Sequence, residues 1–192
     1  MKRTDLLLSK DNQEDILFHL ARYRFVSKFL KPTDDILEIG CGTGYGSRYL
    51  SNYCHYITAQ DSDEEVIKYA NENYKKSNIN YVTDYNPEEK QYEAIVCLEV
   101  IEHMPRKTAL TLMQKMSLMT KDNGIVFIST PRKMDKVSEN RKKYHVHEYT
   151  IGELKEDLDD AFERSFIFSQ LDTEIGAFNY ICAYNYIAIC TV

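Results

Sequence analysis

The sequence has 192 residues, which suits one domain of ordinary size with enough chain to bury a sizeable core. Apolar residues make up 43% and charged residues 28%, as in a globular protein, and no apolar run approaches the ~20 residues that a helical membrane span needs. The net charge of -6 argues against broad binding of nucleic acid, because a duplex-binding protein usually presents a basic surface.

The cysteines indicate a reducing compartment rather than a disulfide framework. Their number, five, is odd, and none stands in a Cys-x-x-Cys pair. The apolar run near the N-terminus, at 6–8, is too short for a signal peptide, so we expect a cytoplasmic protein. Four cysteines lie in apolar stretches, where buried free thiols are expected: Cys54, Cys97, Cys182 and Cys190.

Helical and strand periods alternate along the chain. Apolar residues spaced by three and four, at Phe18, Ala21, Phe25 and Phe29, predict a helix in an N-terminal helical segment over 1–31. Five strands and three helices are then expected, with the strands at 35–39, 55–59, 79–82, 92–98 and 125–129, and the helices near 45–50, 62–74 and 105–119. The second of these helices would begin with a capping box at Ser62–Glu65.

The last third of the chain predicts one more helix and two strands. Thr150 and Glu153 form a capping box before a helix that turns Leu154, Leu158 and Phe162 inward. Strands near 165–171 and 181–190 have no helix between them, which predicts an antiparallel hairpin. The whole pattern predicts a single α/β domain over 1–192, doubly wound, with a mostly parallel sheet and helices on both faces.

Four alternating glycines follow the first predicted strand, at Gly40, Gly42, Gly44 and Gly46. Glycine lets the backbone turn sharply and approach a ligand closely, and the next helix offers N–H groups at its start. Asp61 stands 21 positions after Gly40, where an acidic residue of a nucleotide-binding α/β domain holds ribose hydroxyls. The spacing matches neither Gly-x-Gly-x-x-Gly nor a P-loop. Three interpretations of the glycine loop therefore stay open: a nucleoside site, a plain tight turn, or the dinucleotide site of an oxidoreductase.

The segment Ile36-Leu37-Glu38-Ile39-Gly40-Cys41-Gly42-Thr43-Gly44 resembles the first motif of class I methyltransferases, and the resemblance extends over nearly the whole chain. It implies seven strands with an antiparallel terminal strand, and S-adenosylmethionine as cofactor. Glu38 would orient the loop, Asp61 would hold the ribose, and Asp84 would meet the adenine amine. The implied cofactor-binding residues are Glu38, Gly40, Cys41, Gly42, Thr43, Gly44, Asp61, Ser62, Asp84, Leu98 and Glu99.

A second cluster of polar residues follows the fourth predicted strand, as Glu99-x-x-Glu102-His103. His145 and His147 follow the fifth strand and leave the same edge of the sheet, so one of them could meet His103. One hypothesis makes Glu102, His103 and His145 catalytic, with a histidine as general base for a hydroxyl. Another has Glu99, Glu102, His103 and His145 bind one divalent ion (Mg, Mn, Fe or Zn). A third assigns them structural roles alone.

The same set resembles the small-RNA 2′-O-methyltransferases, in which a later histidine stands three positions before Glu-aromatic-Thr, as His145 does here. The His-x-x-Glu-aromatic pattern also resembles sugar and surface-polymer methyltransferases. Nearby, the segment 131–147 would attract a phosphorylated acceptor, unless it is simply a solvated loop. Its basic residues are Arg132, Lys133, Lys136, Arg141, Lys142 and Lys143.

The favoured hypothesis is an O-methyltransferase for a hydroxyl on a sugar, phosphosugar or nucleic-acid ribose, with metal-dependent methylation of an RNA end as an alternative. Methylation at nitrogen or carbon is less favoured, because the Asn-Pro-Pro-aromatic signature is absent and Ser129-Thr130-Pro131 follows a different strand. A non-catalytic cofactor-binding or regulatory subunit is the hypothesis from another class. No lid is evident, so the site would be open to a large acceptor or closed by a partner protein, and the oligomeric state stays open.

Overall fold

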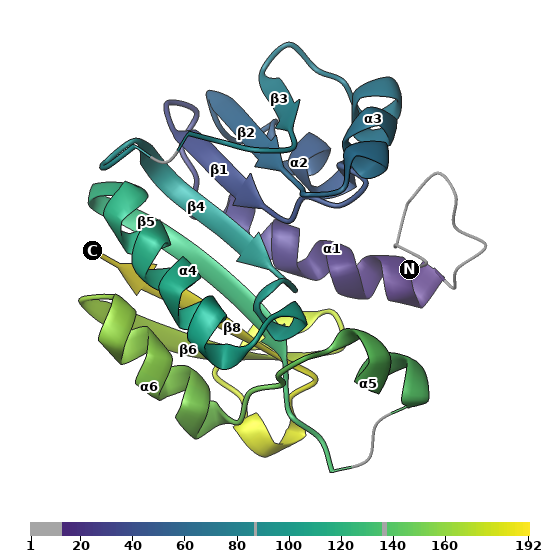
Figure 1. The fold of residues 1–192 in the computed structure, drawn as a ribbon, viewed down its shortest axis with the longest axis vertical. Helices are drawn as coiled ribbons and strands as arrows, with labels where there is room; N and C mark the ends of the chain where they lie inside the picture. The colour runs from purple at the N-terminus through teal and green to yellow at the C-terminus, as the bar shows by residue number, and fades with distance from the viewer. Residues whose placement is uncertain (1–12, 87, 136–137) are drawn as a thin grey trace.

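A computed structural model describes residues 13–86, 88–135 and 138–192. Its centre is a sheet with the strand order β3-β2-β1-β4-β5-β8-β6-β7 (Figure 1). Strands β1 to β5 run parallel, while β8 runs antiparallel to both of its neighbours, β5 and β6. The strands are β1 (Asp35–Ile39), β2 (Tyr56–Gln60), β3 (Ile79–Val82), β4 (Tyr92–Leu98), β5 (Thr120–Pro131), β6 (Arg164–Leu171), β7 (Glu174–Gly176) and β8 (Asn185–Thr191).

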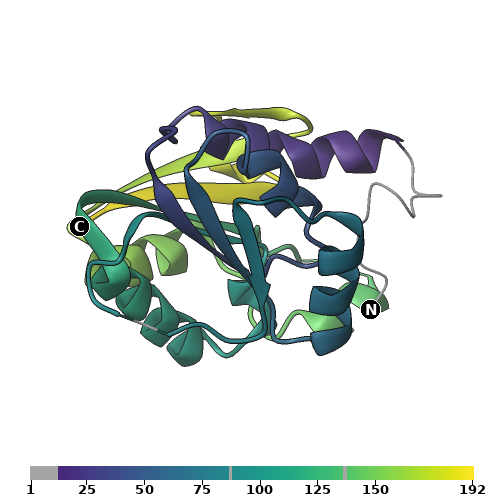
Figure 2. The ribbon, with the colours of Figure 1, turned by 90° about the horizontal axis from the view of Figure 1, so that it is seen from above.

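Helices cover both faces of the sheet. Helix α1 lies on one side and α4 with α6 on the other (Figure 2). Among the described residues, no helix has the length and apolar character needed to cross a bilayer. The helices are α1 (Gln13–Ser27), α2 (Tyr45–Leu50), α3 (Glu64–Asn73), α4 (Arg106–Met119), α5 (Glu139–Tyr144) and α6 (Ile151–Ala161), with 3-10 turns η1 (Ile101–His103) and η2 (Tyr180–Cys182).

The central strands are buried on both faces, as their continuous apolar runs predict. In β1, Leu37 packs in the layer of α4 and α6, and its neighbour Ile36 packs in the layer of α1, α2 and α3. Ile95 and Val96 of β4 divide between the two layers in the same way. This alternation confirms the predicted doubly wound α/β fold.

Several details differ from the sequence expectations. Within residues 13–86, 88–135 and 138–192 the sheet has eight strands rather than seven, because the three-residue β7 and the η2 turn lie between the predicted hairpin strands β6 and β8. Asp63, not Ser62, caps α3, since its carboxylate accepts the Glu65 N–H at 3.1 Å. Cys182 is exposed on the η2 turn rather than buried.

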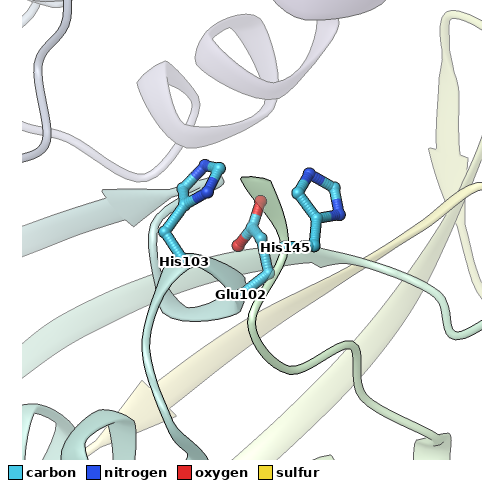
Figure 3. A group of neighbouring side chains, drawn as sticks. All are labelled: Glu102, His103 and His145. Carbon is cyan, nitrogen blue, oxygen red and sulfur yellow. The ribbon is translucent and has the colours of Figure 1, made fainter. Parts of the chain in front are cut away.

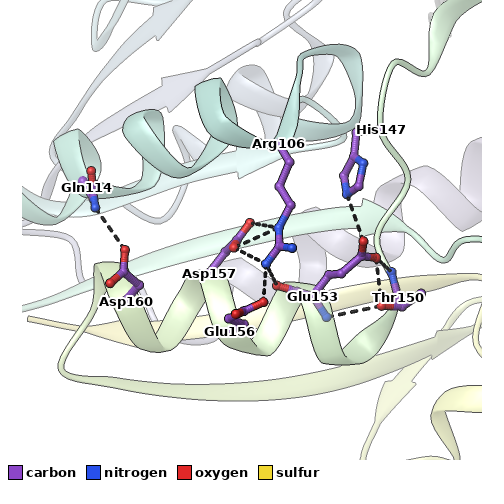
Figure 4. Close-up of polar contacts among 8 residues, drawn as sticks. All are labelled: Arg106, Gln114, His147, Thr150, Glu153, Glu156, Asp157 and Asp160. Carbon is purple, nitrogen blue, oxygen red and sulfur yellow. Dashed lines mark hydrogen bonds and ion pairs between the residues drawn. The ribbon is translucent and has the colours of Figure 1, made fainter.

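Polar contacts join α4 to α6, which lie side by side on one face of the sheet (Figure 4). Nε of Arg106 lies 3.0 Å from both carboxylate oxygens of the buried Asp157. At the start of α6, the predicted capping box is confirmed, with the Glu153 N–H donating to Thr150 Oγ1 at 3.2 Å. The capping box therefore fixes the first turn of α6, which directly follows the segment 145–149 at the site described below.

Candidate functional site

A cavity of about 750 Å³ lies at the carboxyl ends of β1, β2 and β4. The strand order reverses between β1 and β4, and open α/β sheets bind ligands outside this point. Its wall combines the loops after these three strands with part of α1 and with Tyr144 and His145. One cavity therefore brings the glycine loop and the predicted Glu-His cluster together.

Close packing and left-handed backbone explain the first glycines of the loop. Gly40 has a φ of 75°, and a Cβ there would lie 2.4 Å from Cγ2 of Val100 in the loop after β4. Gly42 has a φ of 56°, and its N–H donates to Asp61 Oδ2 at 3.0 Å. Asp61 Oδ1 accepts the Asp63 N–H at 3.1 Å. These bonds hold the Asp61 carboxylate at the cavity wall.

Glu38 lies buried beneath the glycine loop. Its carboxylate accepts hydrogen bonds from the Tyr23 hydroxyl, at 2.9 Å, and from the Ser47 hydroxyl. Burial raises the pKa of Glu38 to about 7, and these two hydrogen bonds oppose the rise. The residue thus links β1, α1 and α2 behind the loop without lining the cavity.

The predicted cofactor residues fall into two groups. Three of them do not line the cavity: Glu38 lies beneath the loop, Gly44 is the residue before α2, and Asp84 is exposed, where Oδ1 accepts the Tyr85 N–H at 2.8 Å. The remaining predicted residues line the cavity: Gly40, Cys41, Gly42, Thr43, Asp61, Ser62, Leu98 and Glu99.

Helix α1 supplies lining residues that the sequence analysis missed, His19, Arg22 and Tyr23. Although charged, Arg22 is 2% exposed. Its guanidinium donates to Gln170 Oε1 at 3.0 Å and to His19 Nδ1 at 2.6 Å. A signal was present in the sequence, because Arg22 stands four residues after Phe18 on the apolar face of the predicted helix.

Glu102, His103 and His145 form a compact group in the described part of the chain (Figure 3). One carboxylate oxygen and one nitrogen from each ring lie within 4.8 Å of one another. Glu99 is outside this group, and its Oε1 accepts the Ser129 hydroxyl at 2.7 Å. His147 is also outside, with its ring centroid 4.7 Å from that of Tyr149.

Both histidines have a hydrogen-bond acceptor at Nδ1. His103 Nδ1 lies 2.8 Å from the Tyr144 carbonyl oxygen, and His145 Nδ1 lies 2.7 Å from Glu148 Oε1. A carbonyl or an ionised carboxylate can only accept, so these contacts place the proton of each neutral ring on Nδ1. Nε2 of each ring then carries the lone pair, which can bind a proton or a metal ion.

Glu102 is a buried carboxyl at the base of this group. Burial and the nearby Glu99 raise its pKa well above the usual value, while Arg22 and the Thr130 hydroxyl oppose the rise. Its backbone carbonyl accepts the Val146 N–H at 2.8 Å and the His147 N–H at 3.1 Å. The turn after β4 and the segment after α5 are therefore bound directly to each other.

The basic segment 131–147 contains the short helix α5, which the sequence analysis did not predict. Arg132 Nε donates to the Ala183 carbonyl at 2.8 Å, and Arg141 pairs with Glu148. Lys142 pairs with Glu139 at 2.8 Å. Burial alone would raise the pKa of Glu148, but Arg141 and His145 hold it below the usual value. Lys136, which belongs to the predicted basic segment, lies outside the described residues.

Residues 11–164 match the model of a methyltransferase domain family. The chain belongs to this family. The match confirms the resemblance of the glycine-loop segment to the class I, Rossmann-like S-adenosylmethionine-dependent methyltransferases.

Comparison with individual proteins supports the same conclusion. A ubiquinone biosynthesis O-methyltransferase of Rickettsia canadensis is 35% identical over 125 residues, which cover 60% of this chain and 48% of the relative. The chain spans about half the length of the curated relatives that it matches.

Two solved structures share the fold. The Pnkp1/Rnl/Hen1 RNA repair complex aligns with a TM-score of 0.66 and 25% identity, over 91% of this chain and 41% of that chain. The N-methyltransferase NodS of Bradyrhizobium japonicum WM9 aligns with a TM-score of 0.68 and 17% identity, over 95% of this chain and 98% of that chain.

Proposed function

We propose that the protein is an S-adenosylmethionine-dependent methyltransferase that methylates a hydroxyl on a sugar, a phosphosugar or a nucleic-acid ribose. The observation that carries the proposal is the shared cavity, which is lined both by the glycine loop with Asp61 and by Glu102, His103 and His145. A cofactor site and a proton-accepting group thus face the same space. The Rickettsia relative, an O-methyltransferase by its name, favours oxygen as the acceptor atom.

The residues around the glycine loop fit the nucleoside part of the cofactor. Asp61 is held at the cavity wall by two backbone N–H groups, where its carboxylate can accept ribose hydroxyls. The left-handed turns at Gly40 and Gly42 let the chain run close to a ligand. When bound, S-adenosylmethionine supplies an electrophilic methyl group on a positively charged sulfur.

The histidines fit the proton transfer that O-methylation needs. A hydroxyl loses its proton as its oxygen forms the new bond to carbon, and a neutral imidazole accepts that proton well near pH 7. In His103 and His145 the Nδ1 contacts leave Nε2 as the proton acceptor. The protein contributes mainly the alignment of the two reactants and this proton acceptor.

The same residues also fit a divalent metal ion. Two imidazole nitrogens and one carboxylate oxygen lie close enough to share an ion, and such a donor set suits Mn²⁺, Fe²⁺ or Zn²⁺. The Nδ1 contacts of His103 and His145 are of the kind that orient metal-binding histidines. A bound ion would polarise the acceptor hydroxyl. Glu99, the predicted fourth ligand, would have to turn its carboxylate from Ser129 toward the group to bind the same ion.

Methylation of a ribose at an RNA end is the second candidate. It is favoured by the Glu-x-x-Glu-His pattern with His145 and by the likeness to a chain of the RNA repair complex at 25% identity. The cationic segment beside the cavity would attract the phosphates of such an acceptor. A non-catalytic subunit that binds the cofactor is the alternative from another class.

Two measurements test these proposals. Calorimetry with S-adenosylhomocysteine, the demethylated product, should show binding that Asp61→Ala weakens, and the absence of binding would refute the cofactor site. Labelled S-adenosylmethionine should then transfer its methyl group to phosphosugars, small phenols or RNA ends, with and without Mn²⁺. Cofactor binding without transfer to any acceptor, with or without metal, would support the non-catalytic alternative.

A further inference from the structure

Arg141 differs from the other basic residues of α5 because its side chain turns inward. Its Nε pairs with Oε1 of Glu148. Nη2 donates to the Arg132 carbonyl at 2.8 Å, and Nη1 lies 3.6 Å from Sδ of Met134. One guanidinium thus joins α5 to the segment after β5 and to Glu148. Lysine has no planar fork and cannot reproduce this set of contacts.

Glu148 connects Arg141 to His145 of the candidate site. Its Oε1 accepts from Arg141 and also from Nδ1 of His145, at 2.7 Å. The Glu148 side chain is 12% exposed, so water competes little for that oxygen. The position of the His145 ring therefore depends on where Arg141 holds the carboxylate.

The two histidines of the group differ in what orients them. His103 Nδ1 donates to the backbone carbonyl of Tyr144, which no side-chain substitution removes. His145 depends on a side chain, Glu148, which in turn depends on Arg141. Of these two ring orientations, only that of His145 is set by a chain of side-chain contacts.

We propose that Arg141 and Glu148 are positioning residues that hold His145 with its proton on Nδ1 and its Nε2 lone pair toward Glu102 and His103. Helix α5, fastened by Arg141, completes the site. The inference rests on the proposed function in giving His145 a role in proton transfer or metal binding. Hydrogen-bond partners of metal-binding histidines typically change metal affinity by ~10- to 100-fold when mutated.

The first test measures Mn²⁺ affinity by calorimetry. Glu148→Gln keeps the size of the side chain but removes its charge, and should weaken Mn²⁺ binding by about 10-fold or more. Arg141→Met should weaken it similarly, and Arg141→Lys by less. Matched controls come from the contacts of Arg106 with carboxylates between α4 and α6, where Arg106→Lys and Glu156→Gln should leave Mn²⁺ affinity within about twofold.

The second test reads the ring of His145 without any metal. Long-range 1H–15N NMR spectra at pH 8 report which ring nitrogen carries the proton. Wild type should show it on Nδ1 of both His103 and His145, and Glu148→Leu should shift only His145 toward the Nε2-protonated form. If the His145 proton is not on Nδ1 in wild type, or does not move in Glu148→Leu, the inference is wrong.

The two tests separate this inference from the proposed function. If wild type binds no Mn²⁺, the metal proposal fails, and the NMR spectra still decide the role of Glu148. If wild type binds Mn²⁺ and the Glu148 and Arg141 variants bind it equally well, the positioning role is refuted while the metal site stands. In an active enzyme, Glu148→Gln should lower kcat and leave the KM for S-adenosylmethionine within about twofold, because Glu148 does not line the cofactor cavity.

Discussion

The contact between Gly40 and Val100 allows a quantitative test of how the glycine loop is packed. In Gly40→Ala, the new methyl group would lie 2.4 Å from Cγ2 of Val100, far inside van der Waals contact. Val100 is β-branched and cannot turn away freely. The left-handed φ of 75° adds about 1–2 kcal/mol and the overpacking about 1–3 kcal/mol. We therefore expect Gly40→Ala to lower the free energy of unfolding by about 2–5 kcal/mol.

Urea denaturation of variants at two other glycines separates the backbone contribution from the overpacking contribution. Gly42 has a φ of 56°, but a methyl group added there would meet no atom within 4 Å, so Gly42→Ala should lose only about 1–2 kcal/mol. Gly152 has no left-handed φ, and a methyl group added there meets no atom within 4 Å, so Gly152→Ala should be neutral or stabilising by about 0.5 kcal/mol. In the double variant, Val100→Ala should recover about 1–3 kcal/mol of the loss in Gly40→Ala. Equal stability of Gly40→Ala and Gly42→Ala, without coupling to Val100, would show that a methyl group at position 40 does not clash with Val100.

Three further outcomes are expected. Asp61→Asn should weaken S-adenosylhomocysteine binding by about 10- to 100-fold in calorimetry, because hydrogen bonds to a charged group contribute about 1.5–3 kcal/mol; unchanged affinity would place the ribose elsewhere. His103→Ala and His145→Ala should each lower kcat by about 10²- to 10⁴-fold and keep product affinity, and loss of both together would indicate misfolding instead. Burial raises the pKa of Glu38 from 4.5 to about 7 on folding, so the folded state binds this proton more tightly than the unfolded chain does. Its contribution to the free energy of unfolding therefore falls as pH rises from about 4.5 to 7. Relative to Glu38→Gln, wild type should therefore lose about 3 kcal/mol in urea melts over that range, and parallel pH profiles would contradict the assignment.

The sheet could be predicted from sequence because its central strands carry an unambiguous pattern. The run Ala94–Leu98 is apolar throughout and is buried on both faces, as expected for a strand in the middle of a parallel sheet. The elements that were missed, β7 and α5, have three and six residues. Elements this short contain less than two turns or two alternations, so they show no period. Helix α2 also has six residues, but it was predicted because it directly follows the glycine loop.

The candidate site was predictable as a set of residues but not as a geometry. The spacing of Glu99, Glu102 and His103 places all three on one side of a regular helical turn, but the chain takes a φ of 58° at Glu99. Only the three-residue η1 turn follows, and the Glu99 carboxylate turns toward Ser129 instead. Backbone geometry of this kind depends on the loop's neighbours and cannot be derived from residue spacing.

The choice between His145 and His147 depended on a tertiary contact. The Glu102 carbonyl accepts the N–H groups of both Val146 and His147, which fixes how the segment crosses the turn after β4. That orientation brings His145 to the cluster and places Nε2 of His147 3.8 Å from Glu153. The loop between two histidines separated by one residue can turn them to different neighbours, so residue spacing leaves both open. The resemblance to small-RNA 2′-O-methyltransferases was what favoured His145 in the sequence.

The contacts of Gln170 have a consequence for the order in which the protein folds. Gln170, in β6, accepts from Arg22 and donates to the Phe18 carbonyl, and these partners stand 148 and 152 positions earlier in the chain. A growing chain on the ribosome can pair β1 to β4 and form the glycine loop long before β6 has been synthesised. Until then the Tyr23 hydroxyl can already bind Glu38, but Arg22 and Phe18 lack their partner in β6. Cofactor binding should therefore reach its full strength only after the C-terminal strands have joined the sheet.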